Sequence, residues 1–329
     1  MRHLLDVAEV QALVRQDGLL LLAGEEALLR QLPVGRWIAG TIPYFMTEQG
    51  GVCDRRRIYV DRPGPGLRYQ GVRRYAAQDV TRIYLDLPPG GVGLMIAPSM
   101  SAAHRSFALN APSSPRFACS PLFGWIAGVH LEDLGRTRAR VFDGTTGEVL
   151  EDDAVVMHAS LEPGYAADLG ILNIFEPGDG PPIVFPETGF TVARAEVGGR
   201  QVELLDWLRE TRLDTRLPLV ADYCGARVNV SFQTVDPGRR EVRFFGPVFA
   251  GVPYRHARSV GDYVRPFESA LPVGVGESVA LSCNCVLNYV HSSLEGRSTD
   301  GIVGPMTFGE IAYQLLNQTM VYLTVSRER

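Results

Sequence analysis

Apolar residues first recur at helical spacing and then gather in short continuous runs. From Leu4 to Val14 their period predicts a short amphipathic helix. Residues 19–23 are continuously apolar, residues 25–32 carry glutamates where a helix would begin, and residues 37–45 are again apolar. We interpret these three segments as a strand, a brief helix and a second strand. Because a helix then connects two successive strands, their order predicts a βαβ-like unit with parallel pairing.

Most of the later apolar segments are short and bounded by turn residues, which is typical of strands. The predicted strands are residues 57–60, 80–87, 122–131, 138–142, 148–150, 154–161, 191–197, 227–235, 241–249 and 318–325, with a long apolar stretch at 278–291. The predicted helices are residues 101–109, 201–213 and 307–317. Turn residues at 143–147 and 236–238 predict two hairpins. The fold class is therefore α/β, with β-rich mixed sheets and flanking helices.

A stretch rich in proline and glycine at residues 176–186 marks the best internal boundary. It predicts one domain over residues 1–178 and a second over residues 179–329. Between them we expect a shared interface, since 329 residues can bury a sizeable core in one or two domains.

Two short sequence motifs, which we call echoes, each occur twice in distant parts of the chain. Trp37–Gly40 recurs as Trp125–Gly128, and Ala39–Tyr44 is echoed by Ala250–Tyr254. Similar strand edges in related sheets would explain both echoes. Two related halves that arose by internal duplication, with a cleft between them, would explain them too. Glycine and proline at such strand ends suit a place where the backbone approaches a ligand or another strand.

Composition excludes several classes of protein. Hydrophobic residues make up 46% and charged residues 21%, so the chain is neither disordered nor a coiled coil. Net charge is −5, which argues against nucleic-acid partners and anionic membranes. All 32 cationic residues are arginine, which excludes lysine-based Schiff-base chemistry. No apolar run resembles a signal peptide or a membrane span, so we expect a soluble cytoplasmic protein.

Several short motifs resemble the FIST domain family. The N-terminal motifs are Leu19–Gly24 and Trp37–Thr41, and a second conserved segment is matched by Phe123–Gly128 with Arg140–Gly144. The C-terminal motifs are Ser282–Cys285, Gly309–Ile311 and Asn317–Thr319. The resemblance covers most of the chain and implies a FIST N-like domain over residues 1–178 and a FIST C-like domain over residues 179–329.

The resemblance implies a sensory module that binds a small polar metabolite, for instance an amino acid. FIST proteins are often fused to signalling output domains, whereas this chain carries none, so we expect a separate signalling partner. A homo-oligomer is compatible with this interpretation. Residues 41–45 depart from the small polar residues that are more common in the family, which leaves the class of ligand open.

Two alternatives involve a cofactor, namely a metal bound by cysteines or a haem bound by a histidine. Cys283 and Cys285 would share one face of a strand, where they could bind a soft metal, form a redox pair or simply be buried. A zinc site would need two more ligands, for which Cys224 and His291 are available. Haem, which some FIST proteins carry, would need an axial histidine such as His256 or His291.

A cysteine-dependent amidase or hydrolase is the enzymatic alternative, although we expect a binding protein more than an enzyme. Cys53 precedes Arg55, Arg56 and Arg57, whose charge would lower the thiol pKa. Cys285 is the other candidate nucleophile, with a histidine such as His291 as its base. A surface turn with solvated arginines would explain the Cys53 segment equally well.

The remaining candidates form a predicted ligand site. Arg55 and Arg57 would share a strand face and could hold a carboxylate. Glu310 fits a capping box with Thr307 at a helix start, but it could also face an amino group of a ligand. Aromatic residues near the echoed strand ends could line a pocket. The candidate ligand-binding residues are Thr41, Tyr44, Arg55, Arg57, Tyr254, Asn284, Asn288 and Glu310.

Overall fold

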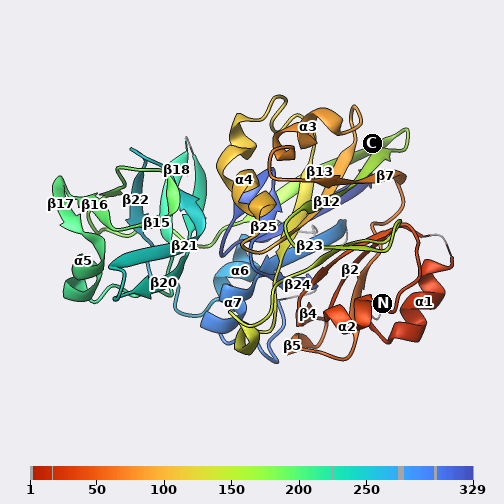
Figure 1. Cartoon of the computed structure of the whole chain (residues 1–329), viewed down its shortest axis with the longest axis horizontal. Helices are drawn as coiled ribbons and strands as arrows, with labels where there is room; N and C mark the ends of the chain where they lie inside the picture. The colour runs from red at the N-terminus through yellow and green to blue at the C-terminus, as the bar shows by residue number, and fades with distance from the viewer. Residues whose placement is uncertain (1–2, 17, 224, 273–277, 300–301, 329) are drawn as a thin grey trace.

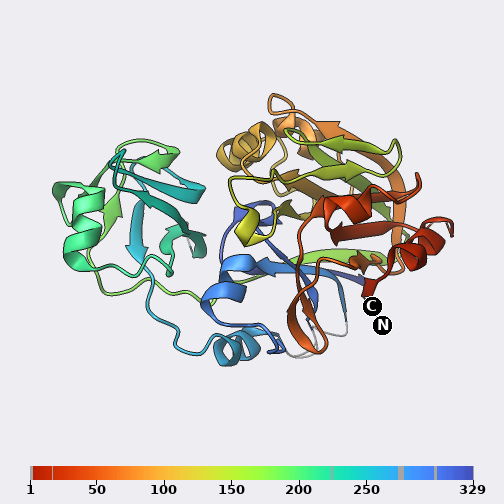
Figure 2. The same ribbon diagram turned by 60° about the horizontal axis from the view of Figure 1, so that its bottom comes forward.

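The two ends of the chain together build one large body, and the middle of the chain builds a smaller one (Figure 1). The computed structural model describes residues 3–16, 18–223, 225–272, 278–299 and 302–328. Strand β13 (Tyr165–Leu172) pairs along its whole length with the C-terminal strand β27 (Met320–Arg327), which ties the ends of the large body together. Both segments that connect the bodies are visible in Figure 2.

Three six-stranded mixed sheets form the large body. The first has the order β1 (Leu4–Leu5), β6 (Ile58–Asp61), β2 (Leu20–Gly24), β3 (Trp37–Thr41), β10 (Val141–Asp143), β11 (Glu148–Leu150). The second has the order β26 (Gln314–Leu316), β25 (Glu310–Ala312), β9 (Leu122–Ala127), β8 (Val92–Pro98), β12 (Ala154–Leu161), β7 (Leu67–Tyr75). The third has the order β13, β27, β23 (Val279–Cys285), β24 (Gly304–Thr307), β4 (Tyr44–Thr47), β5 (Gly50–Cys53).

Short helices complete the large body. They are α1 (Val7–Val14), α2 (Glu26–Leu29), α3 (Ile83–Asp86), α4 (Ala102–Asn110), α6 (Val264–Ala270) and α7 (Val286–His291), with 3-10 turns at Val80–Arg82, Ala111–Ser113 and Leu131–Asp133. No helix in the described ranges has the length and apolar character to cross a bilayer.

One structural unit occurs three times in the large body. Its centre is a parallel strand pair joined by a helix: β2–α2–β3, β8–α4–β9 and β23–α7–β24. A hairpin follows each pair and joins the sheet of another unit, so β4 pairs with β24, β10 with β3 and β25 with β9. We predicted two related halves, whereas the strand pairing shows three related units that close one another's sheets.

The first echo is explained by this repeat, because Trp37–Gly40 and Trp125–Gly128 occupy the topologically equivalent strands β3 and β9. Trp125 also packs directly on β3. A Cβ atom placed on Gly40 would lie 2.4 Å from the Trp125 ring, so only glycine allows this approach. The second echo has no such explanation, since Ala250–Tyr254 belongs to the smaller body.

The smaller body is inserted between β13 and β23 and has its own apolar core. Its strands are β14 (Ile183–Val184), β15 (Gly189–Val192), β16 (Arg194–Val197), β17 (Arg200–Glu203), β18 (Leu219–Tyr223), β19 (Ala226–Val230), β20 (Phe232–Asp236), β21 (Glu241–Val248) and β22 (Pro253–His256), with helix α5 (Leu204–Thr211). The predicted boundary near residue 178 falls close to its start. The chain returns to the large body before residue 279, so residues 179–329 do not form one domain.

The predicted α/β class with mixed sheets is confirmed, and most predicted strands are present. Two assignments are wrong. Residues 80–87 form a 3-10 turn and α3, and residues 307–317 contain the end of β24 and the hairpin β25–β26 instead of a helix. Gly309 has a φ of 156°, which a helix cannot accommodate, and β25 pairs with β9. Tertiary pairing therefore overrides the helical pattern, and no capping box forms there.

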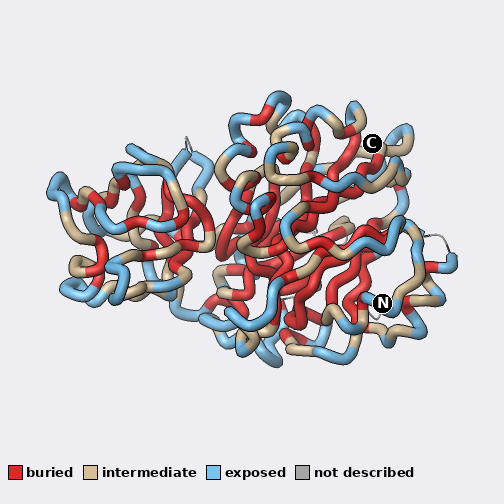
Figure 3. The backbone as a smooth tube through the Cα atoms, viewed as in Figure 1, coloured by how far each residue is buried: buried red, intermediate tan, exposed pale blue. Residues whose placement is uncertain are grey.

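The strands that position the candidate sites are almost entirely buried (Figure 3). All residues of β3, β4, β8 and β9 are buried, and the apolar cluster that they share extends into β23, β25 and β27. Such dense packing holds the ends of these strands in fixed relative positions.

Candidate functional site

A small cavity lies at the carboxyl ends of β3 and β9, and we call it the strand-end cavity. Its volume is about 60 Å³. In sheets with parallel strands and helical connections, ligands bind at this end of the strands. The lining residues are Glu25, Glu26, Thr41, Ile42, Pro43, Arg55, Gly128, Val129, His130, Asp133, Thr137 and Arg138. Both copies of the first echo therefore end at this cavity.

The Thr41 side chain has a structural role at the cavity wall. Its hydroxyl donates to the carbonyl of Gly128 at 2.7 Å and accepts from the Arg140 amide at 2.9 Å. These bonds join the ends of two repeated units. Thr41 lines the cavity, so it can still belong to a ligand site as we predicted. Its hydroxyl, however, already forms hydrogen bonds with two backbone groups.

Three carboxylates (Glu25, Glu26 and Asp133) and two arginines (Arg55 and Arg138) line the strand-end cavity, and ion pairs engage them. Arg55 donates from Nε to Glu25 at 2.7 Å and from Nη2 to Asp133 at 2.9 Å. The hydrogen bond to Glu25 is the main cause that raises the pKa of Arg55. Arg57 instead pairs with Asp54 at 2.7 Å. The two arginines therefore do not form one carboxylate clamp, contrary to our prediction.

Aromatic rings connect the cavity to helix α7. The Tyr44 ring stacks on His130 with centroids 5.5 Å apart and contacts Tyr289 of α7 at the same centroid distance. Its hydroxyl accepts a hydrogen bond from the Leu131 amide at 3.1 Å. Burial raises the pKa of Tyr44 above its ordinary value. Tyr44 lies beside the strand ends but does not line the cavity, so its predicted role as a ligand-binding residue stays a prediction.

Cys53 lies opposite Tyr44 in the β4–β5 hairpin. Burial raises the pKa of its thiol, and this effect exceeds the opposing influence of Arg55. Within the described ranges no histidine forms a hydrogen bond with Cys53 or Cys285. The base that a cysteine hydrolase needs is thus not positioned at either thiol.

A second group of polar residues lies inside the large body, and we call it the core polar cluster. Its members are all buried and come from β23, α7, β24, β25 and the segments before α6 and β27. They are Tyr263, Cys283, Asn284, Cys285, Asn288, Thr307, Glu310 and Thr319. The structure therefore brings together five of the predicted residues (three ligand-binding candidates and both cysteines of the C-x-C motif).

Glu310 is the only acidic member of the core polar cluster. Its Oε2 accepts hydrogen bonds from the Thr319 amide at 3.1 Å and the Thr319 hydroxyl at 2.7 Å. Cys285 forms a further hydrogen bond with this carboxyl group, whereas Oε1 has no partner among the described residues. Burial raises the pKa of Glu310 to about 8.

Two amide side chains and one phenol form the other side of the core polar cluster. Asn288 donates from Nδ2 to Asn284 Oδ1 at 2.9 Å and to the Tyr263 hydroxyl at 3.1 Å. Asn284 Oδ1 also accepts from the Cys285 amide at 2.7 Å. These bonds fix the start of α7 against the segment that returns from the smaller body.

The two cysteines of the C-x-C motif are buried free thiols. Burial raises the pKa of both well above the ordinary value, and the charge of Glu310 raises it further. The described residues contain no group of three metal-ligating side chains of His, Cys, Asp or Glu. Cys224, a predicted third ligand, lies outside the described residues. The metal hypothesis consequently gains no support from the geometry.

Three further predicted residues lie apart from both sites. Tyr254 is in the core of the smaller body, where its hydroxyl accepts from the Phe249 amide at 2.9 Å. His256 Nε2 is 2.9 Å from the carbonyl oxygen of Asp214. His291 ends α7, and its partial burial and the charge of Arg216 lower its pKa. Tyr44 and Tyr254, which we predicted at one cleft, belong to the separate apolar cores of the two bodies.

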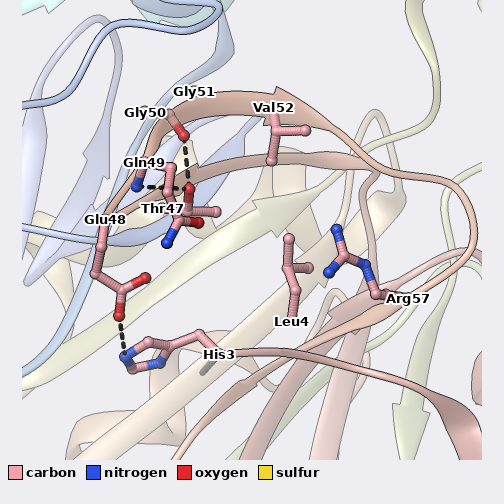
Figure 4. Close-up of a pocket in the computed structure, with 9 residues that line it drawn as sticks. All are labelled: His3, Leu4, Thr47, Glu48, Gln49, Gly50, Gly51, Val52 and Arg57. Carbon is pink, nitrogen blue, oxygen red and sulfur yellow. Dashed lines mark hydrogen bonds and ion pairs between the residues drawn. The ribbon is translucent and has the colours of Figure 1, made fainter. Parts of the chain in front are cut away.

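A larger groove lies elsewhere, between β1 and the β4–β5 hairpin (Figure 4). Its volume is about 810 Å³, and its lining residues are His3, Leu4, Thr47, Glu48, Gln49, Gly50, Gly51, Val52 and Arg57. The polar groups here bind one another: His3 pairs with Glu48 at 3.7 Å, and Thr47 donates to the Gly50 carbonyl at 2.8 Å. We therefore regard it as a weaker candidate than the strand-end cavity.

Sequence reasoning missed several members of both sites. Glu25 and Asp133 flank Arg55 although they lie 30 and 78 residues away from it in the chain. Tyr263 reaches the core polar cluster from the segment between the two bodies. Glu25 carries the one usable signal, since an acidic residue between a strand and a helix often lies at a helix start. The others depend on tertiary pairing.

Comparisons with known proteins place the chain in a family. A family model described as a family of unknown function (DUF6976) matches residues 5–326. None of the curated proteins compared with the chain matches it. The comparisons contain no link to the FIST domain family, so that resemblance stays a prediction. Since the matching model spans nearly the whole chain, the protein belongs to the DUF6976 family.

Proposed function

We propose that this protein is a sensor that binds the amine group of a small polar metabolite, such as an amino acid, in the strand-end cavity. The observation that carries the proposal is the charge of the lining, in which three carboxylates face two arginines. Glu25, Glu26 and Asp133 line the cavity with Arg55 and Arg138, and Arg55 is engaged by two of the carboxylates. An ammonium group supplies the positive charge and the hydrogen-bond donors that these oxygens prefer.

The size of the cavity limits what can enter it. A volume of about 60 Å³ accommodates a few water-sized groups, so an amine head group fits whereas a complete metabolite does not. The rest of the ligand would then lie at the mouth of the cavity. There the half-exposed Arg55 could exchange one protein carboxylate for the carboxylate of an amino acid.

Helix α7 offers a route from the cavity to the smaller body. Tyr289 in α7 contacts Tyr44, which stacks on the cavity residue His130. At its other end, His291 is influenced by the charges of Arg216 and Asp214 in the smaller body. A ligand that displaces His130 would move Tyr44 and α7, and thereby alter the surface that the smaller body offers to a signalling partner.

The hydrolase and haem alternatives receive less support. Both candidate thiols have raised pKa values, and neither is hydrogen-bonded to a histidine in the described part of the chain. Neither His256 nor His291 lines the strand-end cavity. We therefore favour a binding function over either alternative.

Isothermal titration calorimetry with a panel of amino acids and simple amines tests the proposal. We expect one class of amine to bind wild-type protein and to lose about tenfold or more in affinity with Asp133→Asn or Glu25→Gln. Glu162→Gln is the matched control, since Glu162 pairs with Arg68 on a distant surface. If no amine binds, or if the control variant weakens binding equally, the proposal is wrong.

A further inference from the structure

The two segments that connect the bodies pair with each other. One leads from β13 into the smaller body, and the other leads out of it after β22. The Gly178 amide donates to the His256 carbonyl at 2.8 Å, and the Arg258 amide donates to the Glu176 carbonyl at 2.9 Å. Since the pairing is antiparallel, the junction between the bodies has a defined shape.

A cavity of about 410 Å³ lies where this pair of segments meets the end of helix α5, and we call it the junction cavity. Its volume is in the usual range of small-molecule sites, which occur preferentially where two structural bodies meet. Ile183, Trp207 and Leu213 contribute apolar wall, and Gly178 and Arg258 line the cavity from the two segments. A ligand held here would contact α5 and both connections at once.

Trp207 gives the junction cavity an aromatic wall. Its side chain packs against the apolar core of the smaller body but stays partly exposed, whereas Trp37 and Trp125 are each only 2% exposed in the large body. A partly exposed indole beside a cavity offers a face on which a planar ring can stack.

Hydrogen-bonding groups of both kinds line the same cavity. His256 Nε2 donates to the carbonyl of Asp214 at 2.9 Å, because a carbonyl oxygen can only accept. In the neutral ring Nδ1 is therefore an acceptor, and no described residue donates to it. Arg258 uses Nη2 to bind Asp179 at 2.8 Å, and its side chain is 57% exposed, so its other N–H groups can donate to a ligand.

We propose that the junction cavity binds a purine base that carries an amino group. Such a base is a flat, apolar-faced ring that stacks on Trp207. Its N–H groups can donate to His256, and its ring nitrogens can accept from Arg258. The carboxylate of Asp179 lies at the exposed rim and disfavours an anionic ligand, so we expect a neutral base or nucleoside in preference to a nucleotide.

This inference goes beyond the proposed function, because the junction cavity and the strand-end cavity share no lining residue. One site would bind an aromatic ring beside the smaller body, and the other an amine group within the large body. The two proposals can therefore fail separately.

Tryptophan fluorescence of the full-length protein, titrated with adenine, tests this inference. Trp207 is the most exposed of the three tryptophans, so a base that stacks on it should quench the emission. We expect saturable quenching with a dissociation constant below about 1 mM. Cyclohexanol, which lacks a π face, should not quench. Adenosine should bind at least as well as adenine, and AMP should bind more weakly.

Calorimetric titration of variants with adenine locates the site. Trp207→Ala should weaken binding by about fivefold or more, as expected when a stacking platform is removed. Tyr223→Ala is the matched control, since Tyr223 is an exposed aromatic residue of the smaller body that does not line the cavity. If Trp207→Ala does not fold, the exposed Arg258→Gln replaces it and should weaken binding by about threefold.

The assignment is overturned if adenine gives no saturable quenching and no binding heat. It is also overturned if Tyr223→Ala weakens binding as much as Trp207→Ala or Arg258→Gln does. Binding of AMP that is tighter than that of adenosine would contradict the preference for a neutral ligand.

Discussion

The strand-end cavity and the core polar cluster each include the threonine that ends the second strand of a parallel pair, Thr41 of β3 and Thr307 of β24, yet their chemistry differs. The cavity is bordered by ion pairs that reach solvent, such as Arg55 with Glu25. The cluster holds one carboxyl group, Glu310, in a fully buried setting without a cation. The comparison teaches that one backbone arrangement can hold either a solvated charge network or a neutral hydrogen-bonded one. Burial decides which of them is stable.

The strongest test of this contrast between the two sites is the titration of Glu310, for which we expect the largest effect. Its pKa is about 8 in the folded protein against an ordinary value of 4.5, so unfolding releases a proton between these pH values. The free energy of unfolding should therefore fall as pH rises from about 4.5 to about 8, by about 5 kcal/mol in total, and then level off. Urea denaturation across this range measures the slope.

Glu310→Gln is the control for that titration. The variant keeps the size of the side chain and cannot ionise, so its unfolding free energy should depend less on pH in the same window. If wild type and variant show the same slope, Glu310 is not the titrating group and the contrast between the two sites disappears.

A smaller loss of stability is expected when either of two threonines is replaced, each of which ends the second strand of a parallel pair. Thr41 bridges two units at the cavity, and Thr307 in the cluster donates to the carbonyls of Asn284 and Gly309 at 3.3 and 3.1 Å. Replacing either by valine removes the hydroxyl and leaves its buried partners unpaired. We expect each variant to lose about 1–3 kcal/mol of unfolding free energy, measured by urea denaturation.

The difference between the two threonine variants sharpens the comparison. Thr41→Val should also weaken ligand binding at the cavity, since the carbonyl of Gly128 would lose its donor there. Thr307→Val should leave that binding unchanged. Equal effects of both variants on ligand affinity would mean that the two sites are coupled through the shared core.

The smallest effect on stability is expected for Arg55→Gln. Arg55 is half-exposed, and surface ion pairs contribute less than about 1 kcal/mol. The Tm should therefore change little, while the affinity for an amino-acid ligand falls because its carboxylate loses a partner. Calorimetry and a melting curve on one sample separate the two quantities. A large loss of Tm would show that the cavity is a structural ion-pair network instead of a site.

Much of the fold could be predicted from local patterns, because most strands are short apolar runs that end at turn residues. The first echo correctly indicated repetition, but the number of units depends on hairpins that join distant sheets. The segment at residues 307–317 shows the limit of local reasoning. Its apolar spacing suits a helix, while pairing with β9 and the backbone angle at Gly309 make it a hairpin.

The candidate sites were also predictable only in part, because local patterns identify residues that are close in sequence and not those that tertiary pairing brings together. Asn284, Cys285 and Asn288 are close in sequence, so a local pattern could identify them together. Their contact with Glu310 and Tyr263 arises from parallel pairing of β23 with β24 and from the path between the two bodies. Arg55 was noticed for its charge, but its partners come from the distant β2–α2 connection of its own unit and from the segment after β9 in the second unit. The type of each residue was enough to select it as a candidate, whereas its hydrogen-bond and ion-pair partners could be found only from the tertiary structure.

The cyclic exchange of hairpins has a consequence for how the protein acquires its fold. The β4–β5 hairpin, made early during synthesis, can complete its sheet only after β24 has emerged about 260 residues later. Contacts so distant in sequence slow folding, because a long loop must be closed before they form. The smaller body contains only its own strands in its sheets. We therefore expect it to fold first on the ribosome, while the large body waits until β24 and β27 have emerged.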